Sequence, residues 1–386
     1  MINSIIKKSY FKKNNKGTAL AIGTVSKNTI LASHLVSKRM NIPIMLISSR
    51  RQIETKEISK GYVENFTTED YSKFIKKLPS NKLILCRDHG GPYQGSNEEK
   101  LTKIFAMKQA KISYMSDIDN DFKVIHVDPS INPKTVNVEK KIIIEDILEL
   151  IEFCYKYSQK KKKKIFFEIG TEEPSCFTGT PEELNSLVNE LIFHLNKNKL
   201  PKPLYCVLQT GTRVKEFSNV GILNDLKYLN KNSDKIRKIS KICKNNNMFL
   251  KQHNTDYLKE IILKKLPSLN IDAANVAPEF GYVESLCLFQ ILTRYNKKKL
   301  LERFLEISYK SNKWKKWLIK NSKLSDLQKS LISAHYVYAD IEFKELKKEI
   351  QITLPSIIDL DELLISSIKN KIFHYMKCFN YNKCLT

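Results

Sequence analysis

Short apolar runs alternate with longer segments of helical periodicity along most of this chain. The apolar runs occupy residues 18–23, 43–47, 83–86, 123–127, 165–169, 205–208, 248–251 and 269–272. The helical segments cover residues 28–39, 68–77, 98–113, 145–159, 234–245, 255–264 and 279–295, with a further helix that begins at Thr180. Because strand and helix alternate so regularly, the pattern favours a parallel sheet whose strands are connected by helices.

The number of strand–helix units sets the fold class. Eight such units predict a TIM (β/α)8 barrel, an α/β fold whose active site lies at the carboxyl ends of the strands. The competing architecture, a doubly wound open sheet, usually carries a glycine-rich dinucleotide-binding turn after its first strand, and Gly23-Thr24-Val25-Ser26 is not such a turn. Beyond residue 279 the pattern is wholly helical. We therefore expect a barrel in residues 1–298 and a C-terminal helical subdomain, packed on the barrel, in residues 299–386.

The composition limits the partners of the protein. A net charge of +25 is typical of proteins that bind nucleic acid or anionic membranes. The lysines are scattered, however, and the chain carries no aromatic-and-basic RNA motif and no zinc finger, so we predict a solvated basic surface and no nucleic-acid partner. An anionic substrate is compatible with this charge.

Features of targeting and redox chemistry point to the cytoplasm. The basic N-terminus lacks the apolar stretch of a signal peptide, and no apolar run is long enough to cross a membrane. The eight cysteines form no Cys-x-x-Cys pair and no compact disulfide framework. We therefore predict a cytoplasmic protein without a membrane partner.

Chemically versatile residues gather at the ends of the predicted strands. Three of the seven histidines, His89, His126 and His253, follow apolar runs, and Glu172 follows another. Because the carboxyl ends of barrel strands meet at one mouth, these side chains are expected to converge. Imidazole and carboxylate groups together suit a divalent metal such as Zn²⁺, Mn²⁺, Co²⁺ or Ni²⁺. We predict His89, Glu172 and His253 as metal ligands, with one coordination position open to substrate.

Asp88 and His126 are the predicted catalytic residues. A metal can polarise a sugar carbonyl or stabilise an enediolate, while Asp88 moves a proton or supports cleavage of the adjacent carbon–carbon bond. The alternative is that Asp88 only orients His89 through a hydrogen bond. Neighbouring strand residues point to opposite faces, so both groups can enter one site only if the chain bends at Gly90-Gly91.

Polar and cationic residues near the strand ends are candidates for binding the substrate. Arginine and lysine can hold a phosphate or carboxylate, and the polar groups can bind sugar hydroxyls. Turn formation or capping is the alternative for the polar groups, with Asp256 as a cap of the seventh helix, and a solvated surface role is the alternative for Arg50 and Lys215. The predicted substrate-binding residues are Arg51, Gln52, Asp128, Gln209, Arg213, Lys251, Asn254, Asp256 and Asn275.

The strand-end motifs, taken in order, resemble a known family. They are Asp88-His89-Gly90-Gly91-Pro92, His126-Val127-Asp128-Pro129-Ser130, Ile169-Gly170-Thr171-Glu172, Gln209-Thr210-Gly211 and His253-Asn254-Thr255-Asp256-Tyr257. The family is that of the class II D-tagatose-1,6-bisphosphate aldolase non-catalytic subunit, also labelled GatZ/KbaZ-like or tagatose 6-phosphate kinase, and the resemblance covers residues 16–379. It implies a TIM barrel related to metal-dependent class II aldolases. It also implies one of two roles, a subunit that stabilises a separate aldolase chain or a sugar 4-epimerase with a retro-aldol route.

The chain departs from that family after the eighth strand. Asn275-Val276-Ala277-Pro278-Glu279-Phe280-Gly281 stands where sugar-phosphate members usually carry Val-Gly-Pro-Ala-Leu. A helix N-terminus binds anions, and Glu279 in its first turn would compete with a phosphate. Arg50-Arg51-Gln52 and Gly61-Tyr62-Val63 also differ from the family pattern. The substrate therefore need not be tagatose bisphosphate.

These observations lead to one predicted function and one alternative. We predict metal-dependent cleavage or epimerisation of a sugar or sugar phosphate by aldol-type chemistry. The alternative is a non-catalytic subunit that stabilises a separate class II tagatose-bisphosphate aldolase, and the partner is then that aldolase chain or a second copy of this protein. A kinase is disfavoured because neither a Walker loop nor a kinase glycine motif is present.

Overall fold

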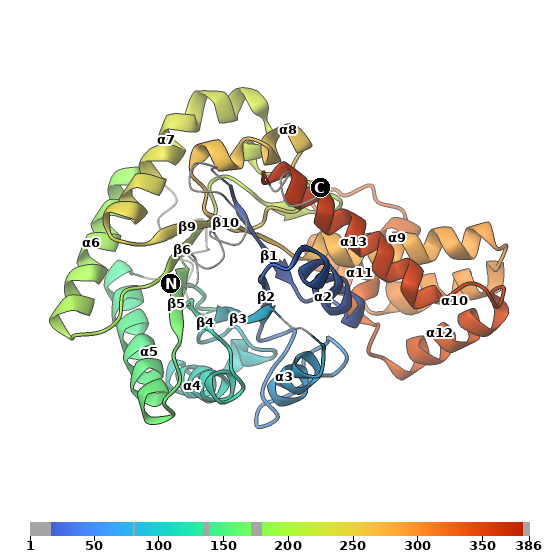
Figure 1. Ribbon diagram of the computed structural model, residues 1–386, viewed down its shortest axis with the longest axis horizontal. Helices are drawn as coiled ribbons and strands as arrows, with labels where there is room; N and C mark the ends of the chain where they lie inside the picture. Colours follow the sequence, from blue (N-terminus) through green and yellow to red (C-terminus); the bar gives the residue numbers. More distant parts are fainter. Residues whose placement is uncertain (1–16, 80–81, 134–138, 171–179, 381–386) are drawn as a thin grey trace.

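Eight parallel strands close into a barrel surrounded by helices in the computed structural model, which describes residues 17–79, 82–133, 139–170 and 180–380 (Figure 1). The order around the barrel is β1-β10-β9-β6-β5-β4-β3-β2. The predicted TIM barrel is confirmed, and an open doubly wound sheet is excluded. The barrel strands are β1 (Ala19–Gly23), β2 (Ile44–Ser49), β3 (Leu83–Gly90), β4 (Val124–Val127), β5 (Phe166–Gly170), β6 (Tyr205–Leu208), β9 (Phe249–Gln252) and β10 (Ala273–Val276).

The strands are apolar because both of their faces are covered. Every residue of β1, β4, β6 and β10 is buried, as expected for parallel strands with side chains inside the barrel and helices outside. The outer helices are α2 (Lys27–Met40), α3 (Thr68–Lys76), α4 (Lys103–Asp119), α5 (Lys140–Lys160), α6 (Pro181–Lys197), α7 (Leu226–Asn245) and α8 (Glu260–Leu263). The predicted helix start at Thr180 is confirmed, because the Thr180 hydroxyl accepts from the Glu183 amide in a capping box.

The chain differs from the predicted elements around the last two barrel strands. The helix expected over 255–264 is only the short α8, because Tyr257 adopts a φ of 57° and interrupts it. The strand expected over 269–272 begins instead at Ala273, since Pro267 lies in a 3-10 turn and Asn270 is left-handed with a φ of 59°. A small antiparallel hairpin after β6, formed by β7 (Val214–Lys215) and β8 (Ser218–Asn219), was not predicted.

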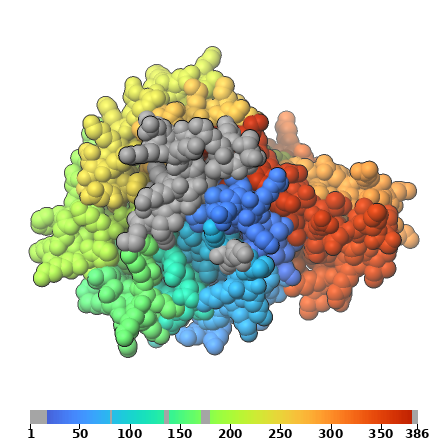
Figure 2. Space-filling view, in the orientation of Figure 1, coloured from blue at the N-terminus to red at the C-terminus, as the bar shows by residue number. Residues whose placement is uncertain are grey.

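The C-terminal helices form a lobe beside the barrel, coloured orange to red in Figure 2. They are α9 (Pro278–Arg294), α10 (Lys298–Lys310), α11 (Asp326–Ser333), α12 (Ile341–Thr353) and α13 (Leu360–Cys378), with 3-10 turns η4 (Lys313–Trp317) and η5 (Ala334–Tyr336). None of the helices in the described residues has the length and apolar content needed to span a membrane.

The last helix, α13, returns to the barrel and packs against α2 and α9 (Figure 1). Its first half, with Leu360 and Leu364, belongs to the apolar cluster of the lobe. Its second half, with Ile368 and Ile372, belongs to the barrel core. The α13 helix thus joins the lobe to the outer ring of barrel helices.

Candidate functional site

A bulge in β3 brings Asp88 and His89 to the same site. The register between β3 and β4 shifts between Arg87 and Gly90, and His89 has a positive φ of 43°. An extra residue in a strand breaks the alternation of its two faces, so that consecutive side chains can point to one side. The bend that both groups require is therefore present, and it begins at His89, one residue before the predicted Gly90.

Two buried arginines hold this bulge. The Arg87 guanidinium binds Asp117 with Nε–Oδ2 and Nη2–Oδ1 distances of 2.8 and 2.5 Å. The Arg50 guanidinium donates to the Gly91 carbonyl at 2.9 Å and also pairs with Glu54 and Glu98. Arg50 is therefore neither a solvated surface residue nor available to an anion, and it stabilises the loop that follows the bulge.

Two of the predicted metal ligands face one another. The Nε2 atoms of His89 and His253 lie 3.2 Å apart. Two ligands at zinc–nitrogen distances of about 2.0–2.1 Å in a tetrahedral site would be roughly 3.3 Å apart. Ligand atoms of Asp88, His89 and His253 all lie within 4.8 Å of one another, so this cluster could hold a divalent ion. The third predicted ligand, Glu172, lies outside the described residues.

The outer nitrogen of each imidazole has a partner. His89 Nδ1 lies 3.3 Å from Asp128 Oδ2, and His253 Nδ1 lies 3.4 Å from Gln209 Nε2. At His89, the Asp128 carboxylate can accept from Nδ1–H, which leaves Nε2 with its lone pair free for a metal, as in many metal-binding histidines. Gln209 presents its NH2 nitrogen to His253 and does not impose this orientation. Asp128 is itself fixed, since Gln94 and Ser130 donate to its carboxylate. Asp128 was predicted to bind substrate, and its contacts are those of a residue that orients His89.

Asp88 lies among imidazoles. Its Oδ1 is 3.4 Å from His126 Nδ1 and accepts from Asn275 Nδ2 at 3.4 Å. Burial raises the pKa of Asp88, but the neighbouring His89, His126 and His253 outweigh this effect and hold the pKa well below its usual value. Asp88 is therefore a carboxylate. It could complete a metal site or accept the proton of a substrate hydroxyl that a bound metal would acidify.

His126 lies directly behind the pair formed by Asp88 and His89. Its Nδ1 accepts from the His89 backbone amide at 3.2 Å. The ring fits only because residue 170 is glycine, since a Cβ there would lie 2.2 Å from His126 Nε2. His126 is fully buried, so its predicted catalytic role would be exerted through Asp88 or the His89 backbone.

The other predicted substrate-binding residues divide into three groups. Gln209 and Asn275 lie beside the histidine and carboxylate cluster, and the Asn275 Oδ1 atom is buried without a hydrogen-bond partner among the described residues. Arg51 and Arg213 are exposed, and Asn254 is half-buried. The third group makes contacts within the protein and comprises Gln52, Lys251 and Asp256.

The third group has identifiable structural contacts. Gln52 donates to the Thr24 carbonyl at 2.7 Å and accepts from the Ser49 amide at 2.8 Å, which ties together the loops after β1 and β2. Lys251 Nζ lies 3.0 and 2.8 Å from the two carboxylate oxygens of Glu168, inside the barrel and fully buried. A substrate would have to compete with these partners to bind either residue.

Asp256 occupies the N-terminus of α9. Its Oδ1 accepts from the Ala277 and Glu279 amides, both at 2.9 Å. It therefore caps the helix after the eighth strand, not the seventh helix. Burial and the nearby Glu279 raise the pKa of Asp256 to about 7. Glu279 itself accepts from the Tyr257 amide at 2.7 Å and pairs with Lys371 at 2.9 Å. The amides that could bind a phosphate are thus satisfied by the protein.

Three supporting residues were missed at the level of sequence. Gln94 donates to Asp128, and Glu168 accepts from Lys251. Gln252 donates to the His253 carbonyl at 2.8 Å. Glu168 carried the one usable signal, because a carboxylate inside an apolar strand needs a buried cation as partner. Gln94 and Gln252 give no such signal, since an amide in a loop or at a strand end is common.

The comparisons with known proteins concern the fold. No protein-family model matches this chain, and no curated protein sequence matches it. A probable tagatose 6 phosphate kinase from Sinorhizobium meliloti 1021 is similar in structure, with a TM-score of 0.76 and 15% identity over 94% of this chain and 100% of that chain. The chain shares its fold.

Two further solved structures have the same architecture. The fructuronate-tagaturonate epimerase UxaE from Cohnella laeviribosi has a TM-score of 0.59 and 9% identity over 94% of this chain and 81% of its own. Fructose-bisphosphate aldolase from Campylobacter jejuni has a TM-score of 0.51 and 13% identity over 99% and 95%. The barrel is thus of a kind found among proteins of sugar metabolism, and the low identities establish the fold alone.

Proposed function

We propose that this protein is a metal-dependent TIM-barrel enzyme that cleaves or epimerises a sugar or sugar phosphate by aldol-type chemistry. The observation that carries the proposal is the pair of histidine Nε2 atoms, 3.2 Å apart, beside the Asp88 carboxylate at the carboxyl ends of the strands. Structural neighbours named as an epimerase and an aldolase support the same class of chemistry, as does the resemblance to the tagatose-bisphosphate aldolase subunit family.

The residues of the site have complementary roles in such a reaction. His89 and His253, with Glu172 as the predicted third ligand, would hold a divalent ion whose positive charge stabilises the substrate oxygens. Asp88 accepts the proton of the substrate hydroxyl as the carbon–carbon bond breaks and the bonding electrons pass into the neighbouring ketone. Return of the same proton after the bond re-forms on the other face of the aldehyde gives the epimer. Transfer of that proton to the enolate carbon, followed by release of the aldehyde and the ketone, gives aldol cleavage.

Other residues orient the substrate. The unpartnered Asn275 Oδ1 can accept a hydrogen bond from a sugar hydroxyl, while its Nδ2 holds Asp88. Gln209 lies on the other side, next to His253. With an amide on either side, the substrate would be held against the Asp88 carboxylate, which is the arrangement that proton transfer requires.

Metal analysis of the purified protein tests the proposal. We expect about one divalent ion per chain, lost in His253→Ala and retained in His194→Ala, a matched change on the outer helix α6. Activity on a panel of ketoses, ketose phosphates and keto-uronates is expected to disappear with the ion and to return on its addition. Absence of bound metal, or activity that a chelator leaves unchanged, would refute the proposal. The non-catalytic role would be favoured if the protein co-purified with a class II aldolase and if the His253→Ala variant stabilised that aldolase as well as the wild-type protein does.

A further inference from the structure

Four cations gather at the mouth of the barrel, and we call them the rim cations. Arg51 follows β2, Arg213 and Lys215 belong to the β7–β8 hairpin segment after β6, and Lys316 belongs to η4 of the C-terminal lobe. Arg51, Arg213 and Lys316 are exposed, and Lys215 is half-buried. Within the part of the chain that the structure describes, none of the four forms an ion pair with a carboxylate. Other cations of the protein do form such pairs, namely Arg50, Arg87, Lys251 and Lys371.

The C-terminal lobe reaches this mouth through a direct contact with the hairpin. Lys215 Nζ donates to the Lys316 carbonyl at 2.7 Å, and the Glu216 amide donates to the Trp317 carbonyl at 2.9 Å. The Lys316 ammonium lies over the rings of Tyr336 and Trp317, at 4.5 and 5.0 Å from their centroids. Aromatic faces attract a cation, so the lobe holds this side chain in a defined place.

The rim cations lie next to the segments that carry the candidate site. Arg213 follows Thr212, whose hydroxyl donates to the His253 carbonyl at 2.7 Å. The backbone carbonyl of Arg51 accepts from the Tyr62 amide at 3.2 Å, and the ring centroids of Tyr62 and Tyr336 are 4.7 Å apart. The cations and the histidines therefore share the carboxyl-terminal face of the barrel, where substrates of this fold bind.

Among the described residues, no carboxylate pairs with the charges of this cluster. The Lys316 side chain is exposed, but its ammonium lies against the rings of Tyr336 and Trp317. Desolvation at this position and the positive charge of Arg51 lower the pKa of Lys316. Desolvation, Arg213 and Lys316 lower the pKa of Lys215. Both shifts disfavour the charged form, and an anion bound among the four would reverse them. The usual anion position of such barrels, the helix N-terminus after the eighth strand, is already taken by Asp256.

We propose that the rim cations bind an acidic group of the substrate, a phosphate or a carboxylate, and that the C-terminal lobe supplies Lys316 for this purpose. The proposal rests on the sugar chemistry proposed above only for the identity of the molecule that bears the acidic group. It makes the lobe part of the substrate-binding surface, and it assigns Lys316 a role that no sequence pattern indicated.

Binding of two simple probes tests the proposal without catalysis. Inorganic phosphate and D-glucuronate are titrated into the chelator-treated full chain, and dissociation constants are measured by phosphorus and proton NMR. Lys316→Met is expected to weaken binding by about tenfold or more, the effect of losing one charge-assisted contact. Lys315→Met is the matched control, because Lys315 is exposed on the same turn but its Nζ lies over Trp314. Partial rescue by Lys316→Arg is expected.

The outcomes separate the two proposals. Preference for phosphate or for D-glucuronate identifies the acidic group. Failure of both probes to bind wild type, or equal effects of the Lys315 and Lys316 substitutions, would overturn the anion site. Turnover of a ketose phosphate or keto-uronate with an unchanged KM in Lys316→Met would also overturn it while leaving the proposed function intact. Lys316-dependent probe binding in a protein that holds no metal would support the anion site and refute the proposed function.

Discussion

Asp88 is the residue whose role decides the chemistry. Its carboxylate lies close enough to His89 and His253 to complete a metal site, and it also contacts His126 and Asn275, which can hold either a ligand or a proton acceptor in place. A neutral side chain of the same shape separates the two roles of Asp88, metal ligand and proton acceptor. Asparagine keeps the shape and one oxygen but cannot take a proton.

Asp88→Asn is expected to retain the bound metal and to lower kcat by about 10²–10⁴-fold, the usual contribution of a general acid or base. Metal content measured beside steady-state rates checks this expectation. His253→Ala is the comparison, since it should lose metal and activity together. A loss of metal in Asp88→Asn as complete as in His253→Ala would identify Asp88 as a ligand.

Lys251 and Glu168 form a fully buried ion pair inside the barrel. Burial lowers the pKa of Lys251, but Glu168 outweighs this effect and raises it, so Lys251 is charged. Lys251→Met would leave Glu168 without a partner, and we expect a loss of about 3–5 kcal/mol of unfolding free energy, measured by urea denaturation. The double variant Lys251→Met/Glu168→Leu should recover most of that loss. A variant of unchanged stability with a raised KM would instead favour the predicted role in substrate binding.

Some residues of the site can be predicted from the sequence, and others cannot. Asp88, His89, His126 and His253 could be assigned to one site, because the carboxyl ends of barrel strands meet whatever their exact neighbours are. The contact between Lys251 and Glu168 could not be predicted, because it depends on which side chains of β5 and β9 meet across the barrel interior. Proximity in the chain is no guide to such long-range partners.

At the scale of elements, seven of the eight barrel strands begin within one residue of their predicted start, whereas the eighth does not. The apolar run at 269–272 is buried like a strand, yet Pro267 and left-handed Asn270 place it in a turn and move β10 to Ala273–Val276. The hairpin β7–β8 was missed because it has only two residues per strand and no alternating pattern. Local turn chemistry thus decided these boundaries.

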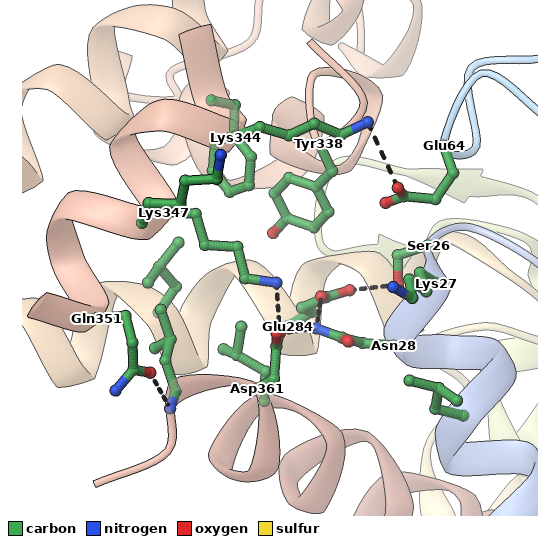
Figure 3. Close-up of a pocket in the computed structure, with 16 residues that line it drawn as sticks. Ser26, Lys27, Asn28, Glu64, Glu284, Tyr338, Lys344, Lys347, Gln351 and Asp361 are labelled. Atoms are coloured by element: carbon green, nitrogen blue, oxygen red, sulfur yellow. Dashed lines mark hydrogen bonds and ion pairs between the residues drawn. The ribbon is translucent and has the colours of Figure 1, made fainter. Parts of the chain in front are cut away.

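A buried acid, Glu284, links helix α9 to the N-terminus of helix α2. Glu284 of α9 accepts from Ser26 Oγ at 2.5 Å and from Asn28 Nδ2 at 2.7 Å, at the N-terminus of α2 (Figure 3). It borders a cavity of about 440 Å³ that Lys347 and Asp361 also line. Burial raises the pKa of Glu284 to about 7, whereas the hydrogen bonds from Ser26 and Asn28 and the charge of Lys347 oppose the shift.

This shift predicts a pH-dependent stability. Between the ordinary pKa of 4.5 and the folded value of about 7, the folded state holds a proton that the unfolded state has released, so the contribution to stability falls as pH rises. Glu284→Gln has no such titration. We expect the difference in unfolding free energy, variant minus wild type, to grow by up to about 3 kcal/mol between pH 4.5 and 8. Urea denaturation at several pH values measures it, and parallel curves for the two proteins would contradict the shifted pKa.

For the whole molecule, the helical lobe was predicted from the loss of strand signals after residue 279, but its connection to the barrel was not. The periodicity of α13 shows an apolar face without showing what covers it. In the structure that face divides between lobe and barrel, and the Thr18 amide at the start of β1 donates to the Phe379 carbonyl at 3.3 Å. The last helix therefore packs on the start of the barrel, and the division into a barrel and a helical subdomain at residue 298 stays a prediction.

Truncation tests that division. A chain ending after residue 298 would lose six buried side chains of the barrel core, Ile368, Ile372, Tyr375, Met376, Cys378 and Phe379. At about 2 kcal/mol for each, this loss approaches about 12 kcal/mol, comparable to the entire stability of a domain. We expect the truncated chain to aggregate and to show no cooperative thermal transition by circular dichroism, whereas a chain ending after residue 380 should keep both. A monomeric, cooperatively folding 1–298 fragment would show that the barrel needs no cover from α13.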